Sequence, residues 1–447
     1  MSESLDTRTG LVEELMARFP SVPPEAVLKE DLLRTGIAFD DSALTQNLDG
    51  EVKPKSYFIF SFDQKPLTQL GEAALRRPPE EIALSGGPHD LRRTIVSVRV
   101  NPDSPYRISR EDGALCLSLE GRGLADVSLP PMPEYYRHTL ANGKTVMETA
   151  PTIEWGYLIY LTVLRLCQYF GAHEECGFCD INHNWRQHRK AGRPYTGVKP
   201  VEDVLEALAL IDRYDTAKAS KAYTLTGGSV TSTVDGLAEA DFYGRYAQAI
   251  EERFPKRWIG KVVAQALPRE DAQRFKDYGI SIYHPNSEVW DKRLFSLISP
   301  GKERYVGREE WHRRILDAAN VFGPRNVIPN FVAGVELARP FGFESIDEAI
   351  ASTTEGLDYF MSRGITPRFT TWCPEPTTPL GRDNPDGAPL EYHIRLLEAY
   401  RETLEKHGLK PPPGYGVAGA GNAVFSVSSF MDTLAPEVVT TEEAVPA

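Results

Sequence analysis

The chain has 447 residues, an ordinary globular composition with 41% hydrophobic and 25% charged residues, and a formal net charge of −13. An acidic protein repels phosphate backbones, and no stripe of Lys and Arg offsets that charge, so nucleic acid is excluded as a main partner. No apolar run of about 18 residues predicts a membrane-spanning helix. The N-terminus, MSESLDTRTG, lacks the basic and apolar regions of a secretory signal. We therefore expect a cytoplasmic protein without a membrane partner.

The first 150 residues combine predicted helices with predicted strands. Residues 11–19 and 24–33 place apolar side chains at helical spacing, with acidic residues between them. Three apolar segments separated by turns that contain Pro and Gly predict strands. These segments are residues 57–62, 94–101 and 114–121. The pattern predicts an α+β region over residues 1–150, whose role the sequence does not indicate.

From about residue 153 onward, predicted strands alternate with predicted helices in six successive units. The strands are residues 157–166, 221–226, 258–264, 280–283, 327–335 and 368–372. The helices are residues 201–214, 238–253, 269–278, 309–322, 346–363 and 390–407. Such a run predicts an α/β fold, a partial (β/α)6 TIM-type barrel with parallel strands and right-handed crossovers. We place the barrel at residues 151–385, a C-terminal helix and Gly-rich segment at 386–430, and a disordered tail at 431–447.

Three of the five cysteines form the pattern Cys167-x8-Cys176-x2-Cys179 after the first predicted barrel strand. The two close cysteines and one from the strand end form a three-point mount of soft thiolates, which suits zinc or an iron–sulfur cluster. A structural zinc site requires a fourth ligand. The histidines near enough to supply it are His173, His183 and His188. Buried free thiols are the third interpretation, because unpaired cysteine is frequently a core residue.

Polar and Gly-rich motifs follow the later predicted strands, at the edge where α/β barrels have their active sites. They are Thr226-Gly227-Gly228-Ser229, HPNSE at residues 284–288, NFVAGVE at residues 330–336, and TWCP at residues 371–374. Together with the cysteine pattern and Phe178 just before its last member, the first three motifs resemble the radical S-adenosylmethionine (radical SAM) superfamily over residues 155–380. Its biotin-synthase-like members are the most similar, including the stretch Pro300-Gly301-Lys302 with Trp311.

Two positions depart from the common pattern of that superfamily. The usual spacing, CxxxCxxC, would put the first ligand at Ala172, whereas the preceding cysteine of this chain is Cys167. Ser229 stands where an acidic residue is more usual. We therefore expect the cluster loop to be the place where this protein differs most from that superfamily.

The resemblance implies a role for each residue of these motifs. Cys167, Cys176 and Cys179 would bind three irons of one [4Fe–4S] cluster and leave the fourth iron to the amino and carboxylate groups of S-adenosylmethionine. The expected cofactor contacts are Phe178, Val332 and Gly334 near the adenine, Thr226, Gly227, Gly228 and Ser229 at the methionine ammonium group, and Asn286 or Glu288 at the ribose. The predicted catalytic residues are Glu336 at the mouth and Cys373, a candidate hydrogen-atom or sulfur donor. Further candidates for facing the substrate are Gln265, His284, Arg368, Thr370 and Glu375.

The implied activity is reductive cleavage of S-adenosylmethionine to a 5′-deoxyadenosyl radical, which abstracts a hydrogen atom from a small biosynthetic substrate. A flavodoxin- or ferredoxin-type electron donor is implied, and a single cluster, because Cys116 and Cys373 stand alone. The sequence leaves open whether C–C or C–S bond formation, sulfur insertion or rearrangement follows, and so whether the enzyme is a transferase, lyase or isomerase. The alternatives are a zinc-stabilised α/β barrel lyase or hydrolase and a non-catalytic barrel stapled by its metal.

Overall fold

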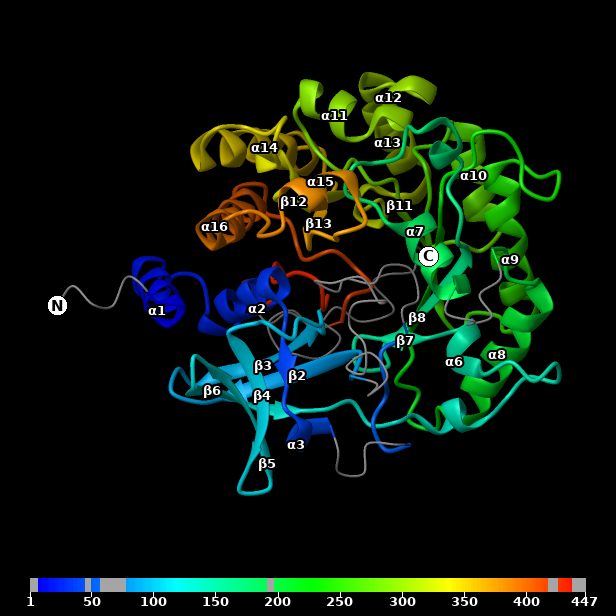
Figure 1. Ribbon diagram of the computed structural model, residues 1–447. Coiled ribbons are helices and arrows are strands. Elements are labelled where there is room, and N and C mark those ends of the chain that lie inside the picture. The colour runs from blue at the N-terminus through cyan, green and yellow to red at the C-terminus, as the bar shows by residue number, and fades with distance from the viewer. Residues whose placement is uncertain (1–6, 45–49, 57–77, 191–196, 417–424, 436–447) are drawn as a thin grey trace.

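The computed structural model describes residues 7–44, 50–56, 78–190, 197–416 and 425–435, and it contains an N-terminal sheet and a barrel (Figure 1). The N-terminal sheet lies at the lower left of the view, and the barrel occupies the upper and right-hand parts. The predicted strand at residues 57–62 lies outside the described residues. Within the described part of the chain, no helix has the length and apolar character needed to cross a membrane.

The N-terminal part is a six-stranded sheet with the strand order β1-β4-β5-β6-β2-β3. Its strands are β1 (Ala38–Phe39), β2 (Glu81–Gly86), β3 (Leu91–Ser97), β4 (Tyr106–Glu111), β5 (Ala114–Leu119) and β6 (Arg122–Ser128). Neighbouring strands pair antiparallel, apart from the parallel pair β1 and β4. The helical elements of this part are α1 (Arg8–Arg18), α2 (Pro24–Thr35), α3 (Asp41–Leu44), η1 (Glu134–Arg137) and α6 (Val146–Thr149). The predicted α+β character is confirmed.

The barrel part contains the parallel strands β8 (Leu158–Leu164), β9 (Ala222–Gly227), β10 (Ile259–Val263), β11 (Ile282–His284), β12 (Asn330–Ala333) and β13 (Arg368–Thr371). Strands β8 to β11 pair in sequence order, β12 pairs with β13, and the short strand β7 (Thr152–Ile153) lies antiparallel beside β8. Parallel bridges from Tyr283 to Val327 and from Glu288 to Phe331 connect the two groups. The strands therefore form an open arc, which confirms the predicted partial barrel.

Helices follow these strands and form the outer layer of the barrel (Figure 1). They are α7 (Ile181–Lys190), α8 (Val201–Tyr214), α9 (Glu239–Arg253), α10 (Arg269–Asp277), α11 (Lys292–Ile298), α12 (Pro300–Tyr305), α13 (Arg308–Phe322), α14 (Ile346–Met361), α15 (Pro379–Asp383) and α16 (Leu390–Lys406), with the 3-10 turns η2 (Gln168–Ala172), η3 (Pro324–Asn326) and η4 (Val335–Leu337). Helix α8 buries Val204, Leu208 and Ile211, one face at helical spacing. Helix α14 begins with a capping box between Ser345 and Glu348. Each of the six predicted strand–helix pairs is present.

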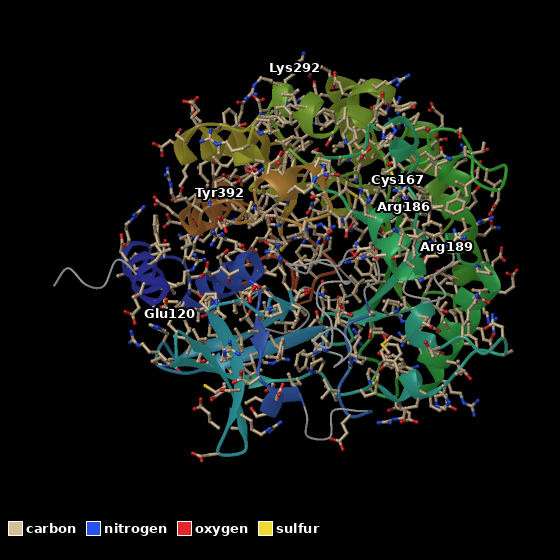
Figure 2. All side chains as sticks on the ribbon, viewed as in Figure 1. Glu120, Cys167, Arg186, Arg189, Lys292 and Tyr392 are labelled. Carbon is tan, nitrogen blue, oxygen red and sulfur yellow. The ribbon has the colours of Figure 1, made fainter. Side chains whose placement is uncertain are left out.

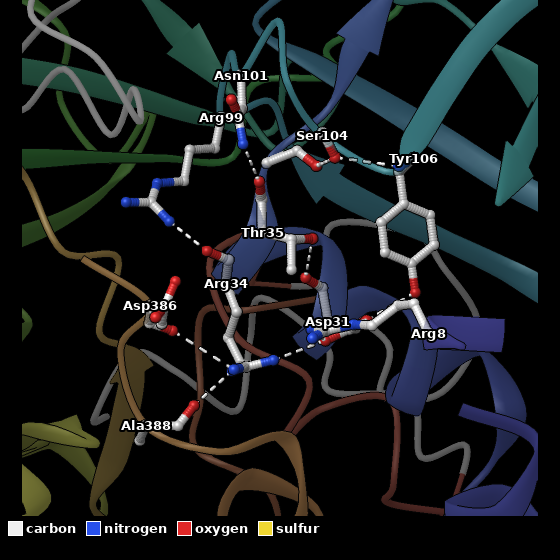
Figure 3. Close-up of polar contacts among 11 residues, drawn as sticks. Arg8, Asp31, Arg34, Thr35, Arg99, Asn101, Ser104, Tyr106, Asp386 and Ala388 are labelled. Carbon is white, nitrogen blue, oxygen red and sulfur yellow. Dashed lines mark hydrogen bonds and ion pairs between the residues drawn. The ribbon is translucent and has the colours of Figure 1, made fainter. Parts of the chain in front are cut away.

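Helix α2 connects the two parts of the protein, because it packs on the N-terminal strand β3 and also on β13 and α16 of the barrel. Near its C-terminal end, the buried carboxylate of Asp31 accepts hydrogen bonds from Tyr106 Oη at 2.8 Å and Arg34 Nη1 at 2.7 Å (Figure 3). Arg8 also pairs with this carboxylate, with Nε at 2.7 Å from Oδ2. The backbone carbonyl of Arg34 in turn accepts a hydrogen bond from Arg99 of the N-terminal part. The N-terminal region is thus built onto the last strand of the barrel.

The C-terminal segment, residues 425–435, covers the free edge of β13. The N–H of Thr371 donates to the Val427 carbonyl at 3.1 Å, and Ser97 at the end of β3 donates to the Ser426 carbonyl at 3.0 Å. An uncovered edge strand exposes unpaired backbone groups, so this segment protects the barrel edge and joins it to the N-terminal sheet. Residues 431–434, which the sequence assigns to a disordered tail, are buried by this packing.

Candidate functional site

A cavity inside the barrel brings together most of the residues that the sequence singles out. Its empty space, which includes the open mouth and the solvent in it, is about 1450 Å³. The predicted site residues that line it are Cys167, Cys176, Phe178, Cys179, Thr226, Gly227, Gly228, Ser229, Asn286, Glu288, Val332 and Cys373. Figure 2 shows Cys167 in the barrel part of the molecule, away from Glu120 of the N-terminal sheet. The cavity thus gathers the cysteine loop and the motifs that follow the later strands at one place.

The long first gap of the cysteine pattern is filled by the 3-10 turn η2, which begins directly after Cys167. Asn182 of α7 holds this first cysteine, because the backbone N–H of Cys167 donates to Asn182 Oδ1 at 2.8 Å. Gly177, which precedes the last cysteine by two residues, donates to the Ile298 carbonyl at 2.8 Å and accepts from the Leu380 N–H at 2.9 Å. Barrel elements thus fix the loop from several sides, and its three cysteines line one cavity despite the unusual spacing.

Gly227 and Gly228 at the end of β9 allow the end of β8 to approach closely. A Cβ atom on Gly228 would lie 2.2 Å from the Leu166 carbonyl oxygen and 2.3 Å from Cys167 Cα. A Cβ atom on Gly227 would lie 2.3 Å from the Leu164 carbonyl oxygen. Real side chains do not fit at such distances, so only glycine permits this packing. The pair therefore has a structural role, positioning the first cysteine, in addition to the predicted contact with the methionine group.

The three thiols of the loop lie in a protein environment that disfavours their charged form. Burial raises the pKa of Cys167 and Cys179 and raises that of Cys176 to about 12, and each thiolate would also repel the others. Lys302 is the strongest group that opposes this shift at Cys176. A bound metal centre supplies the missing positive charge and deprotonates its thiol ligands. The donor set and its setting therefore fit an iron–sulfur cluster.

Single metal ions place a different demand on their ligands, because they need donors that converge on one point. Among the described residues, no group of three or more His, Cys, Asp or Glu side chains is placed to hold one ion. In a [4Fe–4S] cluster, each cysteine binds a different iron, so its three sulfurs need not converge on one atom.

Asn286 and Glu288, the predicted ribose contacts, are both coupled to Lys302 of α12. Lys302 Nζ donates to Glu288 Oε1 at 2.5 Å and to the Asn286 carbonyl at 2.8 Å, and it lies 4.4 Å from the centre of the Trp311 ring. The side chains of Lys302 and Glu288 are only 7% and 10% exposed, so water screens this ion pair weakly. Asn286 Oδ1 is buried and accepts no hydrogen bond from the described residues, which leaves an acceptor for a ligand hydroxyl or ammonium group.

Gly334 and Glu336, two further predicted site residues, do not line the cavity. Gly334 adopts a φ of +107° and its N–H donates to Glu336 Oε2 at 2.8 Å. Glu336 Oε1 accepts from Thr353 of α14 at 2.7 Å and from the hydroxyl of Tyr392 of α16. The carboxylate thus joins the end of β12 to two outer helices, and the structure does not bring it together with the other predicted site residues.

Cys373 lines the cavity, but its thiol donates to the Leu33 carbonyl of α2 at 3.2 Å. Burial raises the pKa of this thiol to about 11, so it is neutral at pH 7. Among the further candidates, His284 is bound to the Ile328 carbonyl at 3.0 Å and does not line the cavity. The other four do line it: Gln265, Arg368, Thr370 and Glu375.

Sequence reasoning missed several wall residues that come from unexpected places. Lys302 and Trp311 appear in the sequence analysis only as part of the family resemblance, without a role in the site. The stretch Pro300-Gly301-Lys302 with Trp311 is the signal that points to them. Tyr160 of β8 lines the wall without any motif around it. Phe425 and Val427 belong to the C-terminal segment, which the backbone bond from Thr371 of β13 to the Val427 carbonyl holds at the cavity.

This fold and this cavity define an α/β protein with an open barrel of parallel strands and a three-cysteine loop at their carboxyl ends. No protein-family model matches the sequence, and no curated protein matches it.

Several solved structures match part of the chain. HydG, a maturase of the [FeFe]-hydrogenase, is 14% identical, with a TM-score of 0.41 over 56% of this chain and 49% of its own. Methylornithine synthase PylB is 12% identical, with a TM-score of 0.38 over 60% of this chain and 75% of its own. The radical SAM enzyme HemN, coproporphyrinogen III oxidase from Escherichia coli, is 13% identical, with a TM-score of 0.34 over 56% of this chain and 52% of its own. The match spans about half the length of HydG and HemN.

Proposed function

We propose that this protein is a radical SAM enzyme that binds one [4Fe–4S] cluster through Cys167, Cys176 and Cys179 and acts on a small molecule. The observation that supports the proposal most is that these cysteines line one cavity together with the motifs that follow β9 and β11. Bound there, the cluster and S-adenosylmethionine would supply a 5′-deoxyadenosyl radical, the species needed to remove a hydrogen atom from an unreactive C–H bond. A flavodoxin- or ferredoxin-type protein delivers the electron.

The residues of the chain prepare the cavity for these groups. Asn182 and Gly228 fix the first cysteine, through a hydrogen bond to its N–H and through close backbone packing. Lys302 balances the charge of Glu288, so that this carboxylate can lie beside a ligand in a weakly solvated wall. Asn286 Oδ1, which has no hydrogen-bond partner among the described residues, would accept a hydrogen bond from the ligand. These contacts orient S-adenosylmethionine before any electron arrives.

Aromatic side chains complete the wall of the cavity. Phe178, Trp372 and Phe425 line it from the cysteine loop, the end of β13 and the C-terminal segment. Their apolar surfaces exclude water and stray hydrogen donors, which protects a reactive radical until it meets the substrate.

The experiment that tests the proposal is anaerobic purification with iron and sulfide analysis, followed by reduction with dithionite in the presence of S-adenosylmethionine. We expect a brown protein with four irons per chain that forms 5′-deoxyadenosine, and a Cys176→Ala variant that forms none. A colourless protein that holds one zinc would overturn the proposal in favour of a zinc-stabilised barrel lyase or hydrolase. Retention of iron without cleavage of S-adenosylmethionine would indicate a non-catalytic barrel in which the metal only stabilises the fold.

A further inference from the structure

Arg368 begins strand β13 and lines the same cavity at the end away from the cysteine loop. Strand β13 ends at Thr371, and Cys373 follows at its carboxyl end. Three residues of extended chain span about 10 Å, so Arg368 lies about that far below the edge of the barrel at which the cysteine loop lies. A molecule that extends from the cofactor toward the bottom of the cavity would meet this side chain.

Among the described residues, the guanidinium group of Arg368 has contacts on one side only. Its Nη1 donates to the hydroxyl of Tyr415 at 2.7 Å, and its central carbon lies 4.6 Å from the centre of the Phe425 ring. Its Nε is buried and, within the described residues, has no hydrogen-bond partner. Arg368 as a whole is 7% exposed. The edge formed by Nε and Nη2, which is the edge that suits a carboxylate in a bidentate pair, therefore has no partner among the residues that the structure describes.

The nearby carboxyl group does not supply the missing partner. Glu154 interacts electrostatically with Arg368, but both of its own carboxylate oxygens are buried without a hydrogen-bond partner in the described part of the chain. Burial raises the pKa of Glu154 to about 8, so this group is mostly protonated at pH 7. Lys261, the other cation nearby, donates to the Gly414 carbonyl at 2.6 Å and lies 4.2 Å from the centre of the Tyr415 ring. Burial lowers the pKa of Lys261 to about 7, so this lysine is only about half charged at pH 7, and Arg368 carries most of the excess of positive charge at the bottom of the cavity.

Two polar side chains beside Arg368 extend this surface. Asn330 is the register partner of Arg368 on β12, and Thr370 Oγ1 donates to Asn330 Oδ1 at 3.0 Å. This bond fixes the amide so that its NH2 group, which has no acceptor among the described residues, is a second donor at the cavity wall. The surrounding wall is aromatic, with Tyr160 and Phe425.

We propose that Arg368, assisted by Asn330, binds a carboxylate of the substrate, and that the substrate is a small carboxylic acid with an apolar or aromatic body. The inference rests on the proposed function, since it names the substrate class of the same cavity. A buried cation without a counter-charge is costly, and a ligand that supplies one monoanion removes that cost. A phosphate monoester would bring about two charges to a single unpaired arginine, and Lys302, the other cation of the wall, is already paired with Glu288.

The test measures the binding of 3-phenylpropionate, its neutral amide 3-phenylpropionamide and inorganic phosphate to the anaerobically reconstituted full-length protein by titration calorimetry. We expect the carboxylate to bind at least about tenfold more tightly than the amide. Arg368→Gln should weaken the binding of the carboxylate by roughly 10- to 100-fold and leave the binding of the amide unchanged. Arg313→Gln, at a side chain that is 59% exposed on α13, is the matched control and should change neither.

Three outcomes would overturn the inference. They are equal binding of carboxylate and amide to the wild type, unchanged carboxylate binding in Arg368→Gln, and an Arg368-dependent affinity for phosphate that exceeds that for the carboxylate. If Arg368→Gln fails to fold in a thermal melt, Arg368→Lys keeps the charge but loses the bidentate geometry. It should then retain amide binding and show intermediate carboxylate binding, and wild-type affinity for the carboxylate would overturn the inference.

This experiment separates the inference from the proposed function. A protein that forms 5′-deoxyadenosine but shows no preference for the carboxylate would overturn the inference alone. A protein that selects the carboxylate through Arg368 but cleaves no S-adenosylmethionine would overturn the proposed function and keep the anion site.

Discussion

The cysteine end and the Arg368 end of the cavity are built in different ways, although they share one wall. At the cysteine end, the ligands lie within thirteen residues of the chain, Lys302 neutralises Glu288 and Asn182 holds Cys167, while Asn286 Oδ1 is left for the cofactor. At the Arg368 end, the groups come from distant segments, and both the Nε of Arg368 and the carboxyl group of Glu154 lack hydrogen-bond partners in the described part of the chain. The buried ion pair at the cysteine end is complete within the chain, whereas at the Arg368 end a ligand has to supply the counter-charge.

The largest effect is expected at the cysteine end. Replacing Cys176 by Ala removes one cluster ligand, so we expect loss of most bound iron and no detectable 5′-deoxyadenosine. Iron and sulfide analysis with a 5′-deoxyadenosine assay measures both. Cys116→Ala is the control, because Cys116 lies in β5 of the N-terminal sheet and does not line the cavity. Equal losses in both variants would contradict a cluster held by the loop.

A large effect on stability is expected from Lys302→Met, which leaves the carboxylate of Glu288 buried without its cation. Removing one partner of a buried pair costs about 3–5 kcal/mol in the free energy of unfolding, measured by urea denaturation. The double variant with Glu288→Gln should recover much of that loss. The control pair, Lys292 and Glu309, is 71% and 67% exposed, and Lys292→Met should cost no more than about 1 kcal/mol. Similar losses of stability in Lys302→Met and Lys292→Met would show that the buried ion pair stabilises the protein no more than an exposed pair does.

Gly228→Ala tests the close packing behind the first cysteine. The added methyl group would meet Leu166 and Cys167 backbone atoms at 2.2 and 2.3 Å, and such overpacking typically costs about 1–3 kcal/mol. We expect lower stability and a lower yield of cluster on reconstitution. Gly171→Ala in the same loop is the matched control, since nothing lies within 4 Å of its added methyl group. A normal cluster yield in Gly228→Ala would mean that the ends of β8 and β9 can move apart without any effect on cluster binding.

The smallest effect concerns the pH dependence at the Arg368 end. Burial raises the pKa of Glu154 from 4.5 to about 8 in the folded protein, so folding favours the protonated form and the resulting stability is lost as the pH rises from about 5 to 8. Glu154→Gln removes this loss. The stability of the variant relative to the wild type should therefore increase over that range, by about 1 kcal/mol or more, in urea titrations at several pH values.

Lys261 acts in the opposite direction, because its pKa is lowered to about 7 and its contribution to stability is lost as the pH falls toward 7. The charge of Glu154 raises the pKa of Lys261, so Glu154→Gln lowers that pKa further, and the comparison reports on Glu154 together with its coupling to Lys261. Parallel stability curves for the wild type and Glu154→Gln would mean that Glu154 stays charged, and the excess of positive charge beneath Arg368 would then be smaller.

The course of the barrel was predictable because local signals agree with the tertiary structure. Residues 201–214, predicted as a helix from the spacing of Val204, Leu208 and Ile211, are helix α8. The motif around Gly227 follows β9 and the motif around Asn286 follows β11, as predicted. The prediction placed Glu336 at the cavity on the strength of a motif, yet Thr353 and Tyr392 draw its carboxylate to the outer helices. Sequence spacing cannot reveal partners that lie on other helices.

By itself, the sequence determined the alternation of strands and helices and the three-cysteine loop, because hydrophobic periodicity and ligand spacing are properties of neighbouring residues. Only the tertiary structure decided what surrounds that loop. It placed Lys302 on Glu288, brought Phe425 and Tyr415 from the C-terminal region to Arg368, and left the Nε of that arginine without a partner in the described chain. The physical reason is that burial and pairing depend on contacts between segments far apart in the chain, and these exist only once the barrel has formed.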